Sequence, residues 1–168
     1  MRQESIHVKK RAFPTIVLAG LLCGVMDITA AFITWAPRGV TPLRILQGIA
    51  SALLGLRSFE GGPTTGVLGA VIHFFIAFSA ATVFYAASRK LPLLIHRPIL
   101  FGILYGVAVY VVMYWIVLPL AHFQGAPRNL FNSIVAMVTH IICVGLPISI
   151  VVSRGVQTVT NAKIMNPR

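Results

Sequence analysis

Four long apolar stretches, separated by short connections that are polar or contain proline, dominate the pattern of hydrophobic and polar positions along this chain. They run over about residues 15–35, 65–87, 99–120 and 132–152. Each holds about twenty residues, and a helix of that length, at about 1.5 Å of rise per residue, spans a hydrocarbon core of about 30 Å. The pattern therefore predicts an all-α integral membrane bundle of four transmembrane helices, folded as a single membrane domain.

A fifth apolar stretch, residues 42–56, is too short to cross a membrane without tilting. A Thr-Pro pair at its start is typical of a helix N-cap followed by proline at the first helical position. Polar and small residues recur on one side of it at helical spacing. We therefore expect a short interfacial or re-entrant helix that presents Arg44, Gln47 and Ser51 to water or to the mouth of the bundle.

Basic residues decide the orientation of the spans. The tails, residues 1–14 and 153–168, and the connection 88–97 together carry 10 of the 14 Lys and Arg. Because cytoplasmic segments carry an excess of Lys and Arg, four spans with both termini in the cytoplasm are predicted. If residues 42–56 also crossed, this bias would vanish. A cleavable signal peptide is disfavoured, since apolar sequence continues past Asp27 without a break.

Composition agrees with a membrane protein. Hydrophobic residues make up 57% of the 168 residues and charged residues only 10%, against about 25% charged residues in a soluble domain. A net charge of +11 would favour a nucleic-acid partner if it gathered on one face of a soluble fold. Here it lies outside the apolar stretches, so the expected partner is the lipid bilayer and not nucleic acid. A homo-oligomer or another membrane protein stays open as a further partner.

Three ionisable residues inside the spans are the candidates for chemistry. Asp27, His73 and His140 each lie on a helix face that also carries small residues, so they should face other helices and not lipid. Each lies about 8–9 residues from the same end of its span, roughly 12–14 Å deep. The sequence therefore predicts one polar layer with contact for at least one Asp–His pair, which Tyr110 or Tyr114 of the third span could close.

Glycines at helical spacing indicate close packing between helices. The predicted packing glycines are Gly20, Gly24, Gly69, Gly102 and Gly106. The pair Gly20 and Gly24 and the pair Gly102 and Gly106 also belong to an apparent internal repeat.

That repeat joins the two halves of the chain. The hexapeptide at 20–25 matches that at 102–107, at a spacing of 82 residues, and residues 71–73 match 138–140 at a spacing of 67. The difference of 15 residues is about the length of the short helix. The economical interpretation is two helical hairpins in parallel orientation, the first of which carries an inserted helix.

No motif points to an enzyme. Hydrolase elbow, zincin, P-loop and dinucleotide-binding patterns are absent, and with three acidic residues in the chain a paired-carboxylate mechanism is nearly excluded. No metal-ligand spacing of Cys and His occurs, so no catalytic residue, metal or cofactor is expected. A structural or accessory membrane protein is the leading interpretation. The alternatives are a small ion or proton transporter that uses the Asp/His layer and, less favoured, a haem protein with His73 and His140 as axial ligands.

Several short segments carry a resemblance to a family. They are Gly24-Val25-Met26-Asp27-Ile28, Arg44-Ile45-Leu46-Gln47-Gly48-Ile49-Ala50-Ser51, Phe59-Glu60-Gly61-Gly62, His73-Phe74-Phe75-Ile76-Ala77-Phe78 and Cys143-Val144-Gly145-Leu146-Pro147. Between about residues 18 and 151 the chain resembles a group of small, uncharacterised bacterial inner-membrane proteins with four spans. The resemblance implies a bacterial cytoplasmic membrane and no particular activity.

Overall fold

Four spans form the body of this protein. The computed structural model describes the backbone of residues 2–120 and 129–165 and the side chains of residues 12–119 and 129–156. The helical stretches long and apolar enough to cross a membrane are Ala12–Arg38, Gly62–Lys90, Pro98–Val117 and Leu130–Val156. No strand occurs in the described ranges. The predicted all-α membrane bundle of four spans is confirmed.

The elements follow the chain in a simple order. They are α1 (Arg2–Trp35), the 3-10 turn η1 (Ala36–Arg38), α2 (Pro42–Leu54), the 3-10 segment η2 (Gly55–Phe59), α3 (Gly62–Lys90), α4 (Leu93–His96), α5 (Pro98–Val112), the π-helical segment η3 (Met113–Val117), α6 (Leu118–Leu120), α7 (Leu130–Thr139), the π-helical segment η4 (His140–Gly145) and α8 (Leu146–Met165). The third span thus runs through α5, η3 and α6, and the fourth through α7, η4 and α8.

Helix ends differ from the predicted ends of the spans. α1 begins at Arg2 and contains Pro14, although residues 1–14 are predicted as a tail, and α8 continues to Met165 past the predicted end at 152. Apolar sequence marks the part of a helix that can lie in lipid, and the helix itself can continue into polar sequence. The short helix α2, in contrast, ends before its predicted end at residue 56. It stops at Leu54 because Gly55 adopts a φ of +59°, which favours glycine.

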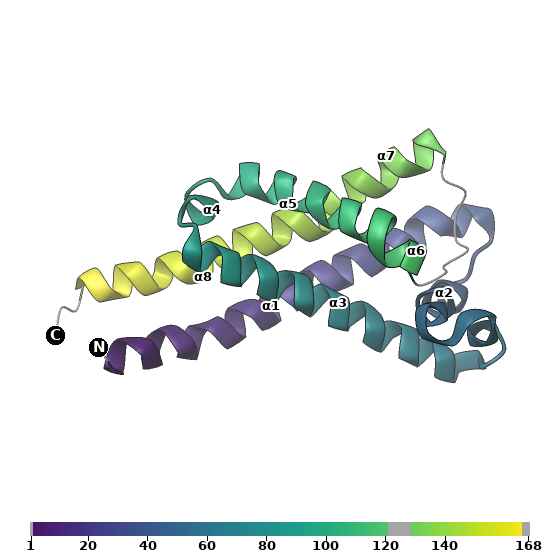
Figure 1. Cartoon of the computed structure of the whole chain (residues 1–168), viewed down its shortest axis with the longest axis horizontal. Coiled ribbons are helices and arrows are strands. Elements are labelled where there is room, and N and C mark those ends of the chain that lie inside the picture. Colours follow the sequence, from purple (N-terminus) through teal and green to yellow (C-terminus); the bar gives the residue numbers. More distant parts are fainter. Residues whose placement is uncertain (1, 121–128, 166–168) are drawn as a thin grey trace.

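α1 lies at the centre of the packing. It contacts α3 on one side and α8 with η4 on the other, while α5 packs against η4 and α8. The order around the bundle is therefore α3, α1, the fourth span and α5. Both termini lie at one end and α2 lies at the opposite end (Figure 1). We call these the terminal end and the α2 end.

The tightest core lies in the half of the bundle toward the terminal end. Its buried hydrophobic residues are Ala19, Cys23, Ala77, Ala81, Phe84, Val144, Ile148, Val152 and Val156. Tyr105 of α5 closes this core from the side, because its hydroxyl donates to the Ala80 carbonyl of α3 at 2.7 Å. Ser149 and Ser153 of α8 donate to the carbonyls of Pro98 and Ile95, which fixes α4 to the fourth span.

Glycines allow the helices of each hairpin to approach closely. A Cβ atom on Gly24 would lie 2.7 Å from the ring of Phe74 in α3, and Gly20 faces Phe78 in the same way. A Cβ atom on Gly106 would lie 2.5 Å from the Cα atom of Ile141 in η4, and Gly102 faces Leu146. Each glycine pair thus packs against the second span of its own hairpin, as small residues do in membranes.

The short helix α2 packs along α3. Gly69, the remaining predicted packing glycine, faces the backbone of Leu46, so α2 and α3 are in backbone contact. Thr41 caps α2 by accepting from the Arg44 amide at 3.2 Å. One expectation was wrong: Gln47 is only 4% exposed, because its side-chain amide turns to α3 and donates to the Gly62 carbonyl. Arg44 is exposed as expected, and Ser51, although buried, faces the interior of the bundle, where it lines a cavity described below.

Candidate functional site

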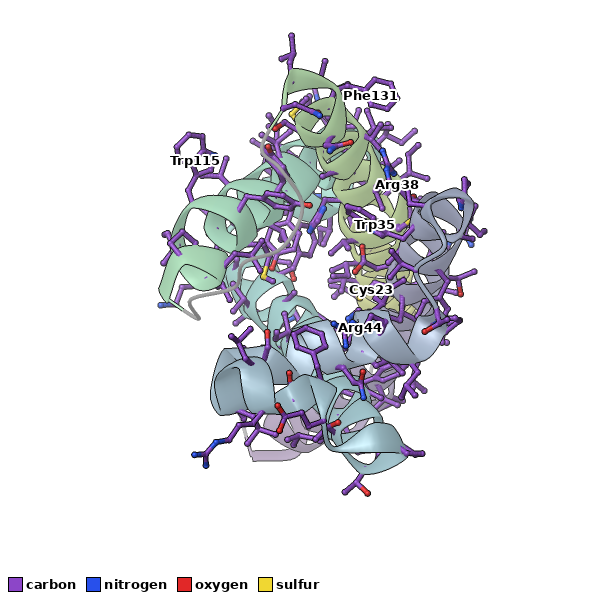
Figure 2. The ribbon with its side chains drawn as sticks, turned by 90° about the vertical axis from the view of Figure 1, so that its right-hand side faces the viewer. Cys23, Trp35, Arg38, Arg44, Trp115 and Phe131 are labelled. Carbon is purple, nitrogen blue, oxygen red and sulfur yellow. The ribbon has the colours of Figure 1, made fainter. Side chains whose placement is uncertain are left out.

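A large cavity lies between the spans in the half of the bundle toward the α2 end. Its volume is about 820 Å³, within the range of about 300–1,000 Å³ typical of small-molecule sites. All four spans and α2 contribute to its wall. Most of the lining is apolar, and its polar or charged side chains are Asp27, Thr34, Arg38, Arg44, Ser51, His73, Tyr114, Asn132, Ser133, Thr139 and His140. Seen from the α2 end, which faces the viewer in Figure 2, the helices surround a central opening.

The cavity forms because the four spans do not all pack closely against one another. α1 packs closely against both α3 and the fourth span, whereas α3 and α5 meet at Tyr105, where the phenol lies edge-on to Phe84 at 4.9 Å between ring centroids. Toward the α2 end the cavity separates the two helices. Residues of α3 such as Ile76 and of α5 such as Val109 then line the cavity from opposite sides.

Asp27 lies on the wall of this cavity. Its side chain is half-buried and makes no hydrogen bond or ion pair with any residue that the structure describes. A carboxyl group at the depth of a membrane span is costly without a partner. No hydrogen bond or ion pair joins Asp27 to a histidine in the described part of the chain, and Asp27, His73 and His140 all line one cavity, as one polar layer would.

His73 joins the two spans of the first hairpin. Its Nε2 atom lies 2.9 Å from the carbonyl oxygen of Gly24, the second glycine of the GxxxG motif in α1. A carbonyl oxygen only accepts, so the Nε2 atom carries the proton and the Nδ1 atom keeps its lone pair. His73 thus acts as an interhelical hydrogen bond, and its ring also lies edge-on to Phe74.

His140 occupies the corresponding place in the second hairpin but has a different bond. Its Nδ1 atom donates to the Ala136 carbonyl of its own helix at 2.8 Å, which leaves the Nε2 atom as the acceptor. Its ring lies edge-on to Tyr110 and Tyr114, with centroids 6.0 and 6.1 Å away. Tyr110 stacks on Tyr114 but does not line the cavity, so of the two tyrosines only Tyr114 belongs to its wall.

Two π-helical segments position these residues. In η3 the amide of Leu118 donates to Met113, and in η4 the amide of Leu146 donates to Ile141, each five residues back. Tyr114 lies in η3 and His140 begins η4. Short π segments inside helices occur frequently at functional sites. Sequence reasoning did not anticipate either segment.

The two histidines fit the proposed internal repeat. His73 contacts Gly24, while a Cβ atom on Gly106 would lie 2.9 Å from the His140 carbonyl oxygen. Gly106 follows Gly24 by 82 residues, and His140 follows His73 by 67 residues. In each hairpin the histidine therefore lies beside the second glycine of the GxxxG motif.

Arg38 and Arg44 complete the cavity at the α2 end. The guanidinium of Arg44 lies over the ring of Phe59 at 4.0 Å, and that of Arg38 lies over Trp35 at 4.9 Å. Arg38 also donates to the Thr34 carbonyl and to the side-chain oxygen of Asn132, both at 3.2 Å. Sequence reasoning did not include Arg38 in the site. The signal that could have identified it is a basic residue on the side of the membrane that the positive-inside rule predicts to be poor in basic residues.

The geometry speaks against axial ligation of haem by both histidines. His73 engages its Nε2 atom with a backbone carbonyl, so that atom is not free to bind iron. Among the described residues no group of three or more His, Cys, Asp or Glu side chains is arranged to hold a metal ion. The histidines therefore serve better as hydrogen-bonding groups of a cavity wall.

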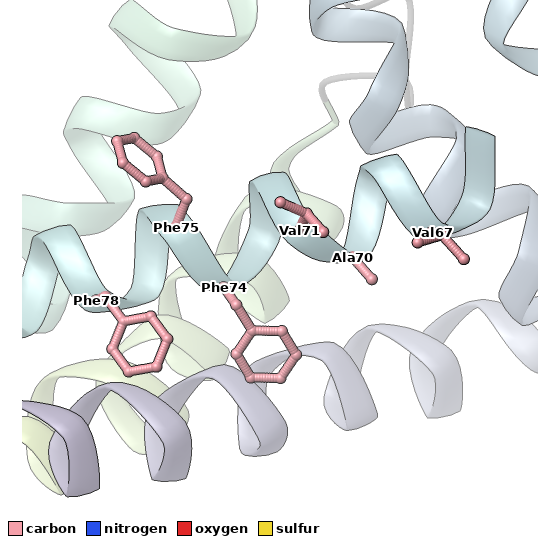
Figure 3. A pocket seen from close by; sticks show the side chains of 6 residues that line it. All are labelled: Val67, Ala70, Val71, Phe74, Phe75 and Phe78. Atoms are coloured by element: carbon pink, nitrogen blue, oxygen red, sulfur yellow. The ribbon is translucent and has the colours of Figure 1, made fainter. Parts of the chain in front are cut away.

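A second, shallower hollow lies on the outer surface of α3. Its volume is about 490 Å³ and its lining is entirely apolar: Val67, Ala70, Val71, Phe74, Phe75 and Phe78 (Figure 3). Phe74 and Phe78 extend from α3 over α1, where Gly24 and Gly20 make room for them. This hollow offers no polar group and suits the acyl chains of the surrounding lipid.

Comparison with known proteins found no matching family model, no similar curated protein and no similar solved structure.

Proposed function

We propose that this protein resides in the bacterial cytoplasmic membrane with both termini in the cytoplasm. The segments at the terminal end carry 10 of the 14 Lys and Arg, which favours the cytoplasm for that end. The α2 end then faces outward, and the cavity opens to the extracytoplasmic side. The resemblance to small four-span proteins of the bacterial inner membrane supports the same placement.

We propose further that the protein is a carrier that couples a proton to a small solute bound in this cavity. The observation that carries this proposal is Asp27, a carboxyl group on the wall of a membrane cavity that lacks a partner among the described residues. Intramembrane carboxyl groups and histidines recur in the proton relays of transporters. A purely structural role explains His73, which bonds to Gly24, but gives Asp27 no partner.

The distribution of packing supports a carrier that alternates between two states rather than an open channel. The half toward the terminal end is closed by the core around Phe84 and Ile148, both at most 2% exposed, while the other half is hollow. Transport would then require the two hairpins to rock against each other about the cavity, as repeats do in other carriers. No chemical step is proposed, since the cavity holds a single carboxyl group and no nucleophile paired with a base.

Asp27 and His140 are the proposed proton-handling residues. The Nε2 atom of His140 carries a lone pair, because its Nδ1 proton is donated to Ala136. This atom can therefore accept a proton from the cavity. Asp27 supplies the second site within the same cavity.

Proton uptake into proteoliposomes tests this function. Because a coupled carrier moves protons together with its solute, vesicles with an internal pH dye and a potassium diffusion potential, negative inside, are offered small organic anions, cations and neutral solutes in turn. With at least one of these solutes the wild-type vesicles should acidify faster than protein-free vesicles. Asp27→Asn and His140→Gln should reduce the protein-dependent rate by roughly tenfold or more, as loss of a proton-transfer group typically does. His96→Gln is the matched control, since His96 is exposed in α4 and does not line the cavity. Equal rates in protein-free and wild-type vesicles with every class of solute would contradict the proposal.

A further inference from the structure

The class of solute can be inferred from the two arginines of the cavity, an inference that rests on the proposed function. Arg38 and Arg44 both line the cavity and both are exposed at the α2 end. Figure 2 shows Arg44 on α2 at one side of the opening and Arg38, at the end of α1 beside α7, at another. Two cations thus stand at the mouth of an otherwise largely apolar cavity.

Aromatic rings hold both guanidinium groups in place. Phe59 covers one face of Arg44 at 4.0 Å, and Trp35 covers one face of Arg38 at 4.9 Å. Stacking on a ring leaves the N–H groups at the edge of the guanidinium plane free to bind a ligand. Arg44 makes no side-chain hydrogen bond with a described residue, so its whole edge remains available. Arg38 uses two of its donors and keeps the others.

No carboxylate neutralises these arginines within the described chain. The described acidic residues are Asp27 and Glu60, and neither forms an ion pair with Arg38 or Arg44. Asp27 precedes Arg38 by eleven residues in sequence, about 16 Å along a helix axis. The mouth of the cavity is therefore positive and its far wall carries the single carboxyl group.

Apolar side chains fill the wall between these charges. Ile28, Ala31, Ile45 and Ile49 line the cavity between the mouth and Asp27. A ligand that satisfies both parts needs a negative end for the arginines and an apolar body for this wall. Guanidinium groups bind planar or tetrahedral oxyanions through paired N–H donors.

We propose that the solute is an amphipathic oxyanion, with a carboxylate, phosphate or sulfonate head held between Arg38 and Arg44 and an apolar body lying along the cavity toward Asp27. Such a molecule can come from outside as a free organic acid or from the outer leaflet as an anionic lipid. The head-group chemistry is the same in both cases, so the experiment must separate the two sources.

Fluorescence of Trp35 reports binding directly, because this residue lines the cavity and Trp115 does not. The full-length Trp115→Phe protein in neutral phosphatidylcholine nanodiscs is titrated with octanoate, octanol, octylammonium and inorganic phosphate. Octanoate should give a saturable change with a Kd at least about tenfold below that of octanol, as expected for charge-assisted hydrogen bonds to the head. Octylammonium and phosphate should bind more weakly still. The Trp35→Phe protein, which keeps Trp115, shows any change caused by partition into the bilayer.

Arginine variants assign the site. Arg44→Gln should weaken octanoate binding by about tenfold or more, and Arg38→Gln should do the same. Arg57→Gln should leave the Kd within about twofold, since Arg57 is an exposed arginine of η2 that does not line the cavity. A Tm equal to that of the parent protein shows that each variant is folded. If anionic phosphatidylglycerol in the nanodiscs competes with octanoate, the lipid is the source; if it does not, a free acid is.

Several results would overturn the inference. Equal binding of octanoate and octanol, tighter binding of octylammonium, or wild-type affinity in a folded Arg44→Gln protein would each refute an anion site. Binding of octylammonium that depends on Asp27 would refute the anion while leaving a solute cavity in place. Arginine-dependent binding of octanoate together with no proton uptake would instead refute the proposed carrier and keep the anion site.

Discussion

Replacing Gly106 by alanine tests the packing on which the second hairpin depends. An added Cβ atom would lie 2.5 Å from the Cα atom of Ile141 and 2.9 Å from its amide nitrogen. Ordinary van der Waals contact begins near 3.4 Å, so the shorter distance is about 0.9 Å too small. Both neighbours are backbone atoms of η4, so α5 and η4 must separate rather than a side chain rotate.

Gly66→Ala provides the matched control. Its Cβ atom would approach only the Cδ1 atom of Leu43, the end of a flexible side chain that is 39% exposed and can move. Both substitutions gain the same helix propensity, about 1 kcal/mol relative to glycine, so this contribution cancels in the comparison. The remaining difference is the overpacking of Gly106→Ala, about 1–3 kcal/mol.

Thermal unfolding measures the difference. In a background where the partly exposed Cys143 is replaced by alanine, Cys23 is the remaining thiol; it is 1% exposed and becomes reactive to a fluorogenic maleimide when the bundle opens. At about 2–4 °C per kcal/mol for a chain of this size, Gly106→Ala should have a Tm several degrees below that of Gly66→Ala. A Tm for Gly106→Ala equal to or above that of Gly66→Ala would refute the close approach of α5 and η4.

Two further predictions concern the topology and the short helix. Reporter fusions within residues 88–97 and after Arg154 should both report the cytoplasm, and an external signal at either point would contradict the orientation. In a protein whose native cysteines are replaced, a cysteine at the exposed position 44 should react with an impermeant thiol reagent added outside. A cysteine at position 47 should react far more slowly, because Gln47 is 4% exposed, and equal rates would show that α2 does not pack on α3 as described.

Sequence reasoning predicted the parts of the fold that depend on local properties. The four spans follow from the length of the apolar stretches, and the start of α2 follows from the Thr41 cap with Pro42 behind it. The ends of the helices were harder to predict from the sequence. Hydrophobicity reports where lipid can surround a helix, and α1 continues through Pro14 to Arg2 beyond that region.

The candidate site was only partly predictable for a different reason. Small residues around Asp27, His73 and His140 indicate an inward face, and all three line the cavity. The cavity itself depends on the separation of α3 and α5, which no periodicity in either helix encodes. The hydrogen bond of His73 to Gly24 likewise depends on how closely α1 and α3 approach. Arg44 was expected at the mouth, but Arg38 lies in a turn outside every helical pattern.

The π-helical segment η4 changes how the fourth span tolerates changes in length. An α-helix turns about 100° per residue, and the wider turn at His140–Gly145 accommodates one residue more than a regular helix would. Ser149 and Val152 are oriented inward with this extra residue in place. Loss of one residue within 140–145 can therefore be absorbed by a return to a regular helix in which α7 and α8 keep their phase, whereas loss of one residue from the regular part of α7 or α8 shifts the residues beyond it by about 100°. The segment η4 is thus the place where this span can lose a residue while the cavity wall of α7 and the closed core of α8 keep their relative orientation.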